Sequence, residues 1–245
     1  LNIILKHNEN KILDILSSGE NIKPELKRAR TIILCAYSAI FYYVGLLFKH
    51  VCTEGNLIND CDIFLAGNGS KLLKWVSNSE EAVTNALRGI IRKATDPLAL
   101  NSIEIFFPQA YKEEVAKGLL YPGEFLQAEK RIFHLLGESG FELKDQGQRL
   151  PWNFNLYAEG DDLAFNKLRV PSDFEELRKF LRALDSVTTD LGLEKVAHLL
   201  DASAIKARIE QRVRELAEAK KKDMALIQPL LIEEIKWVLN NLIGR

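Results

Sequence analysis

The residues that could do chemistry stand at positions 67–70, where Gly-Asn-Gly-Ser follows the short apolar run Ile63–Ala66. That run is too short for a helix and is bounded by turn residues, so it predicts a buried strand. Glycines allow a backbone to approach a ligand closely, and asparagine tolerates left-handed backbone angles. The free N–H groups at the start of the helix predicted at Lys71–Val76 favour a polar or anionic ligand. The turn alone is a weak signal, because many strand-to-helix turns contain two glycines.

The segments around this turn predict an α/β layout. A long apolar helix is expected from Pro24 to about Val51, and an amphipathic helix from about Glu80 to Lys93. A second strand is predicted at Ser102–Phe107. Further helices are predicted at 1–17, 111–120 and 123–137. Strands that alternate with helices are typical of a parallel sheet covered on both faces.

The pattern changes after residue 140. Residues 146–162 are polar and contain glycine and proline, which predicts a loop or a short irregular hairpin. From Ser172 onward the pattern is helical, and Ser172 with Glu175 has the spacing of a capping box. Helices are predicted at 202–223 and 224–242. The predicted organisation is an α/β lobe at 1–140, a linker at 141–171 and a helical region at 172–245.

Two segments together resemble the actin-like ATPase superfamily of heat-shock chaperones, sugar kinases and actin. The string IFLAGNGSKLLKWV resembles its adenosine motif, in which a buried strand ends in a Gly-rich turn and Ser before a helix. The later string SIEIFFPQAYKEEVAKGLL resembles its last core strand and closing helix, with the acidic-Val-Ala-x-Gly pattern at 114–118. The resemblance spans about residues 23–126. It implies half of an actin-like (ribonuclease-H-like) lobe with a mostly helical C-terminal extension, from a bacterial heat-shock-like ATPase.

The resemblance implies that this chain binds ATP or ADP through its nucleoside. The superfamily's adenosine contacts carry over to three residues of the turn, with Asn68 lining it. Two lysines are added as candidates, although a solvated helix face is the alternative for both. The candidate nucleotide-binding residues are Gly67, Asn68, Gly69, Ser70, Lys71 and Lys74.

The superfamily's phosphate loops, of the form Asp-x-Gly-(Thr/Ser), are not found in this sequence. The chain begins at Leu1 rather than at methionine, so these loops and their Mg²⁺ are expected upstream, in a longer protein. No catalytic residue or metal ligand is predicted here, and the fragment alone is expected to be inactive. The helical region does not resemble the β-rich peptide-binding domain of heat-shock chaperones, so chaperone activity is not implied.

Composition limits the other classes of function. The formal net charge is −1, which gives no electrostatic indication of nucleic-acid binding. Three cysteines without CxxC spacing indicate a reduced, cytoplasmic compartment. Residues 31–48 carry no charged side chain and could form a membrane span, but their hydroxyl groups and amphipathic flanks favour a buried core helix.

Two functions from different classes follow. The first is an adenine-nucleotide-binding part of an actin-like ATPase. The alternative is a non-catalytic interaction module, in which the Gly turn is only a tight connection and the charged helices at 172–245 bind a protein partner. The process that an ATPase cycle would drive is left open.

Overall fold

The computed structural model describes residues 24–53, 60–95, 102–107, 142–143, 147, 149, 168–221 and 230–244. These residues are mostly helical and include a small parallel sheet, which confirms the mixed α/β class. The helices predicted at 1–17, 111–120 and 123–137 lie outside the described residues, as do most of the residues of the predicted linker.

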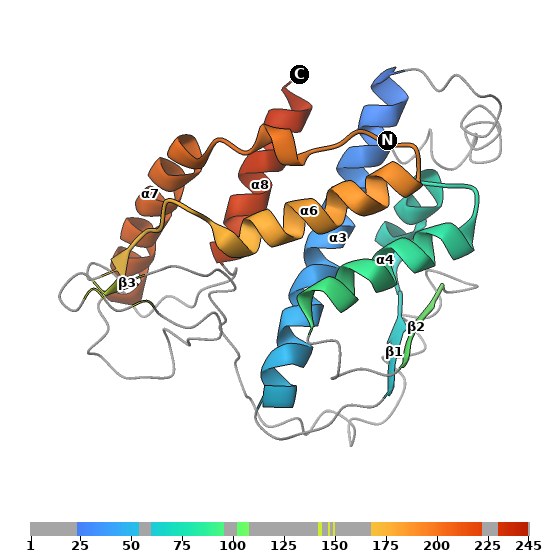
Figure 1. Cartoon of the computed structure of the whole chain (residues 1–245), viewed down its shortest axis with the longest axis horizontal. Coiled ribbons are helices and arrows are strands. Elements are labelled where there is room, and N and C mark those ends of the chain that lie inside the picture. Colours follow the sequence, from blue (N-terminus) through green and yellow to red (C-terminus); the bar gives the residue numbers. More distant parts are fainter. Residues whose placement is uncertain are drawn as a thin grey trace.

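Helix α3 (Pro24–Thr53) crosses the middle of the structure and contacts α4, α6 and α8 (Figure 1). Its N-terminal proline begins the helix as predicted, because a first-turn proline loses no intrahelical hydrogen bond. By length and composition α3 could cross a membrane, yet half of its apolar stretch is buried against the rest of the protein. Leu34, Tyr42 and Leu46 are completely buried. This packing is the one expected of a core helix.

Strands β1 (Asp60–Phe64) and β2 (Ser102–Phe106) pair in parallel, as predicted for this part of the chain. The prediction of a buried strand at Ile63–Ala66 was wrong, because the residues of β1 alternate between exposed and half-buried. Ile103 and Ile105 of β2 are buried on the side of α4 (Glu80–Ala94). On the opposite face Phe64 and Phe106 occupy paired positions, and their rings stack with centroids 4.8 Å apart. Both rings are exposed, so described elements cover only one face of this sheet.

Gly45 sets the distance between α3 and α4. A Cβ atom at this position would lie 2.6 Å from Ala94 Cβ and 2.7 Å from the Ile91 carbonyl oxygen. Such distances are far below van der Waals contact, so only glycine lets the two helices approach this closely. The contact positions α4, which in turn supports β2.

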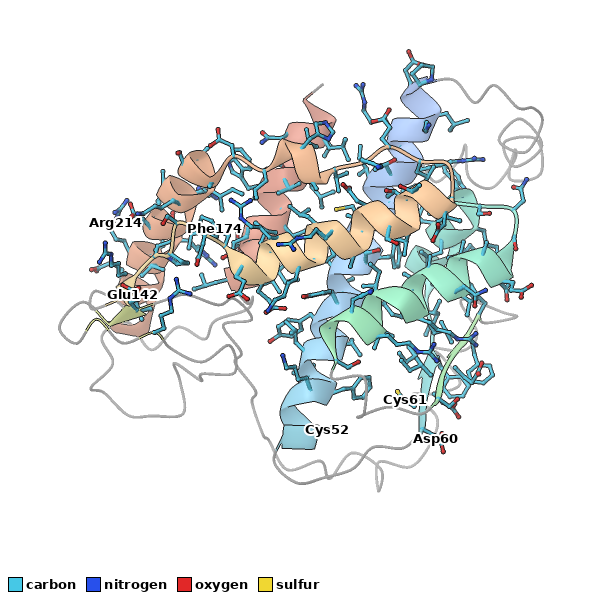
Figure 2. All side chains as sticks on the ribbon, in the orientation of Figure 1. Cys52, Asp60, Cys61, Glu142, Phe174 and Arg214 are labelled. Carbon is cyan, nitrogen blue, oxygen red and sulfur yellow. The ribbon has the colours of Figure 1, made fainter. Side chains whose placement is uncertain are left out.

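Three helices and a short 3₁₀ turn form the C-terminal part: α6 (Glu175–Asp190), η4 (Ala197–Leu199), α7 (Ala202–Lys221) and α8 (Leu230–Ile243). The predicted capping box was wrong. Phe174, labelled at the start of α6 in Figure 2, occupies the N-cap position with a left-handed φ of 45°, and no side chain caps the helix. Phe174 is fully buried, so packing fixes the start of α6 where the Ser172 hydroxyl was expected to do so.

A short antiparallel pair precedes α6. Strand β3 (Glu142–Leu143) pairs with β4 (Leu168–Arg169), and Arg149 forms an isolated bridge with Glu142. Most of the loop or hairpin predicted at 146–162 lies outside the described residues, so it stays a prediction. The described helices of the predicted lobe and of the predicted helical region share one hydrophobic core, in which the rings of Tyr42 and Phe180 meet edge to face at 5.3 Å. The division at 141–171 stays a prediction.

Candidate functional site

The Gly-rich turn follows β1 directly. Gly67 has φ 79° and ψ 164°, a backbone region that is essentially restricted to glycine. The segment Asn68–Trp75 is a 3₁₀ helix, η1, rather than the α-helix predicted at Lys71–Val76. The backbone N–H of Ser70 donates to the Gly67 carbonyl at 3.3 Å, three residues back, which is the bond that starts a 3₁₀ helix.

Two side-chain hydrogen bonds hold this turn. The Ser70 hydroxyl donates to the Gly67 carbonyl oxygen at 2.7 Å, and the Tyr37 hydroxyl donates to the Gly69 carbonyl oxygen at 2.5 Å. Ser70 is buried, so its hydroxyl belongs to the internal structure of the turn. Because Tyr37 belongs to α3, the turn is fixed to the central helix.

The structure brings Gly67, Gly69 and Ser70 together at the end of β1. Gly69 is exposed, and a Cβ atom at Gly67 would meet no other atom within 4 Å. Lys71 is half-buried and Lys74 is exposed on η1. The side chain of Asn68 lies outside the described part of the structure. The turn therefore has a fixed interior and an open outer surface, on which a ligand could contact the backbone.

Sequence reasoning missed Tyr37 as part of this turn. The sequence indicated only that Tyr37 places a hydroxyl group within an apolar helix, and that such a group needs a hydrogen-bond partner. Burial raises the pKa of the Tyr37 hydroxyl, so the group stays protonated and remains a hydrogen-bond donor at neutral pH. The partner is 32 positions away in the sequence, and helical periodicity contains no information about such a contact.

A second polar group lies within the helical core. The Tyr42 hydroxyl donates to Glu176 Oε1 at 2.5 Å, and Lys179 Nζ lies 3.6 Å from Glu176 Oε2. Glu234 of α8 is completely buried; this burial, and then the charge of Glu176, raise the pKa of its carboxyl group. The sequence offered one signal for this group, because a tyrosine in the middle of an apolar helix requires a hydrogen-bond partner.

Other chemistry receives less support from the described residues. A hollow of about 360 Å³ lies between α4 and β2, where Arg88 forms an ion pair with Glu104. Within the described ranges, His, Cys, Asp and Glu side chains form no group of three or more that could hold a metal ion.

No protein-family model, no curated protein and no solved structure matches the chain.

Proposed function

We propose that this chain is an adenine-nucleotide-binding part of an actin-like, heat-shock-like ATPase, and that the turn at residues 67–70 contacts the nucleoside. The observation that carries the proposal is the turn itself. A glycine-only backbone conformation follows a parallel strand, its interior is fixed by Ser70 and Tyr37, and its outer surface is open.

The position of the turn suits this role. In open α/β sheets, ligands bind beyond the carboxyl ends of parallel strands. Gly67 follows the carboxyl end of β1, whose neighbour β2 runs in the same direction. The hydrogen bond from Tyr37 holds the Gly69 carbonyl before any ligand arrives, and such preorganisation reduces the entropy lost on binding.

The remaining chemistry belongs, in this proposal, to a longer protein. ATP or ADP would lie between two lobes, with its phosphates and Mg²⁺ at phosphate loops outside this chain. The turn would supply nucleoside contacts through the backbone of Gly67 and Gly69, with Asn68, Lys71 and Lys74 as further candidates. Ser70, which the resemblance also implies as a contact, is buried and would hold the turn from inside. No catalytic group is assigned to this chain.

The interaction-module alternative stays a prediction. It assigns partner binding to the charged helices at 172–245. One of them, α7, has a narrow apolar stripe whose spacing suits a helical hairpin. In the structure the stripe residues Ile205, Ile209 and Val213 are buried, and α7 packs against α8. This stripe is therefore used within the chain, and only the charged face of α7 is left for a partner.

Calorimetric titration with ATP and with ADP tests the proposal, on this chain and on a longer chain that restores the upstream lobe. Gly69→Val places a branched side chain on the outer surface of the turn and is expected to abolish binding by the longer chain. Gly69→Ala is the milder variant. Its Cβ would lie 3.6 Å from Tyr37 Oη, an ordinary contact, so the fold should be retained while affinity falls.

Gly89→Ala is the matched control, because it makes the same chemical change within α4, where the nearest atom, Val187 Cγ1, is 3.8 Å away. It should leave binding unchanged. If neither chain binds nucleotide, or if Gly69→Val lowers only the stability and retains binding, the turn is a structural connection and the proposal fails.

A further inference from the structure

Glu234 is a carboxyl group without a described partner in the hydrophobic core. Its residue is completely buried on α8, between Leu231 and Ile235 on the same helix face, both of which are also buried. Neither carboxyl oxygen has a hydrogen-bond partner among the described residues. An ionised carboxylate in such a place would lose its hydration without compensation, which is one of the largest costs a folded protein can carry.

Glu176 is also buried, but its surroundings differ from those of Glu234. It lies in the first turn of α6, where the helix dipole favours a negative charge. It accepts the hydrogen bond from Tyr42, and Lys179 lies one helical turn further on with Nζ 3.6 Å from Oε2. Glu176 therefore has a hydrogen-bond donor and a cation beside its carboxyl group, whereas Glu234 has neither among the described residues.

We propose that Glu176 and Glu234 form an acid pair in which Glu234 keeps the proton, and that loss of this proton with rising pH loosens α8 from α3 and α6. The pair would make the docking of the last described helix sensitive to pH. Two neighbouring carboxylates in a low-dielectric core cannot both be charged without strong repulsion.

Among the described residues no ion pair includes Glu234. Arg30 of α3 is buried as well. From α3 the group near the pair is Tyr42, whose pKa is raised by burial and by Glu176, so it stays neutral. From α6 it is Lys179, which pairs with Glu175 and Glu176.

The remaining neighbours are engaged elsewhere or face solvent. From α7, Arg212 lies 3.8 Å from Glu233, and Lys236 on α8 itself lies 3.6 Å from the same carboxylate. His198 of η4 is exposed. Lys179, Arg212 and Lys236 therefore pair with Glu176 or Glu233. The pKa of Glu234 is raised by burial and by the charge of Glu176.

The direction of the pH dependence follows from these surroundings. Burial, and then the charge of Glu176, raise the pKa of Glu234 well above its ordinary value. In the unfolded chain this carboxyl ionises near its ordinary pKa of about 4.3, so folding above that pH takes up a proton. The stabilisation is therefore complete below about pH 4.3 and is lost progressively as the pH rises toward the folded-state pKa.

Urea unfolding of the wild type and of Glu234→Gln, from about pH 5 to about pH 9, tests the proposal. Each pH unit in which only the unfolded state is ionised should lower the wild-type folding equilibrium constant by up to about tenfold. Glu234→Gln is isosteric and neutral, so it should remove this dependence and be more stable than the wild type at the upper end. Glu233→Gln, on the same helix, is the matched control and should keep the wild-type slope.

Two further measurements locate the effect. Amide hydrogen exchange over residues 230–243, corrected for intrinsic rates, should show protection of α8 falling with pH in the wild type and not in Glu234→Gln. Infrared spectroscopy of the wild type at neutral pH should show a protonated carboxyl band that is lost in Glu234→Gln. A missing band, or an unchanged slope in Glu234→Gln, overturns the proposal. An unfolded Glu234→Gln protein does the same, since a neutral side chain of this shape is what the proposal requires.

Discussion

Tyr42 donates a hydrogen bond of 2.5 Å to Glu176, and the two residues are separated by 134 positions in the sequence. The bond connects α3, in the predicted α/β lobe, with the start of α6 in the predicted helical region. The Tyr42 ring also meets Phe180 edge to face, with an interplanar angle of 70°. One side chain therefore provides both a polar and an aromatic contact between the two parts of the chain.

Replacing Tyr42 by phenylalanine tests the strength of this connection. Tyr42→Phe keeps the ring but leaves a buried carboxylate without its donor, so we expect a loss of about 1–3 kcal/mol in the free energy of unfolding. Urea denaturation measures the change. Tyr37→Phe removes a second hydroxyl from α3, the one that donates to the carbonyl oxygen of the exposed Gly69. It should lower the free energy of unfolding by about 1 kcal/mol or less. If both variants lost the same free energy of unfolding, the buried Tyr42–Glu176 bond would contribute no more to stability than the exposed Tyr37–Gly69 bond.

Gly45→Ala is expected to separate α3 from α4. The added methyl would clash with Ala94 and with the Ile91 carbonyl, and the backbone carbonyl cannot rotate away as a side chain would. We expect a destabilisation of about 1–3 kcal/mol or more, measured by thermal or urea unfolding. Gly89→Ala is the opposite case. It lies in the interior of α4 with room for a methyl group and should stabilise the protein by about 0.5–1 kcal/mol. A neutral Gly45→Ala variant would mean that the helices do not touch at this point.

Asp185 fixes the connection after α6. Its Oδ1 atom accepts hydrogen bonds from the backbone N–H groups of Val196 at 2.6 Å and Ala197 at 3.1 Å. Asp185→Ala should cost about 1.5–3 kcal/mol, because these are bonds to a charged acceptor and their donors are partly buried. Asp190→Ala is the control. That acidic residue is exposed at the C-terminal end of α6, where the helix dipole disfavours it, so its removal should be neutral or slightly stabilising. Similar losses in both variants would argue against a specific role for Asp185.

The thiols of Cys35 and Cys61 should differ in reactivity toward iodoacetamide. Cys35 is completely buried, and burial raises the pKa of its thiol to about 12. Because the thiolate is the reactive form, Cys35 should stay unmodified in the folded protein at about pH 8 and react only after denaturation. Cys61 on β1 is half-buried, and its pKa is raised by burial and by Asp62, so it should react slowly but before Cys35. Peptide mass spectrometry over a time course measures both, and early modification of Cys35 would show that α3 is not buried as described.

The sequence by itself determined the larger elements of this protein. The first-turn Pro24 and the apolar spacing located α3, predicted from 24 to about 51 and observed from 24 to 53. Amphipathic spacing located α4, predicted from about 80 to 93 and observed from 80 to 94, and both strands were found within a few residues. The helices were located from a local period of 3.6 residues, and the first strand from a short apolar run bounded by turn residues, both of which a sequence displays directly. The Gly-rich turn was also visible in the sequence, because glycines mark turns. The backbone angles found at Gly67 are ones that only glycine readily adopts.

Only the tertiary structure decided what those elements contact. The bond between Tyr37 and Gly69, the approach of α3 to α4 at Gly45, and the bond between Tyr42 and Glu176 each join residues from different elements. The start of α6 is a further example, since the fully buried Phe174 and not Ser172 occupies the N-cap position. Local propensity is worth a few tenths of a kcal/mol to about one kcal/mol per residue, whereas burying one aromatic or aliphatic side chain is worth about 1.5–3 kcal/mol. Long-range packing therefore overrides local signals at such positions, and it becomes visible only when the chain is folded.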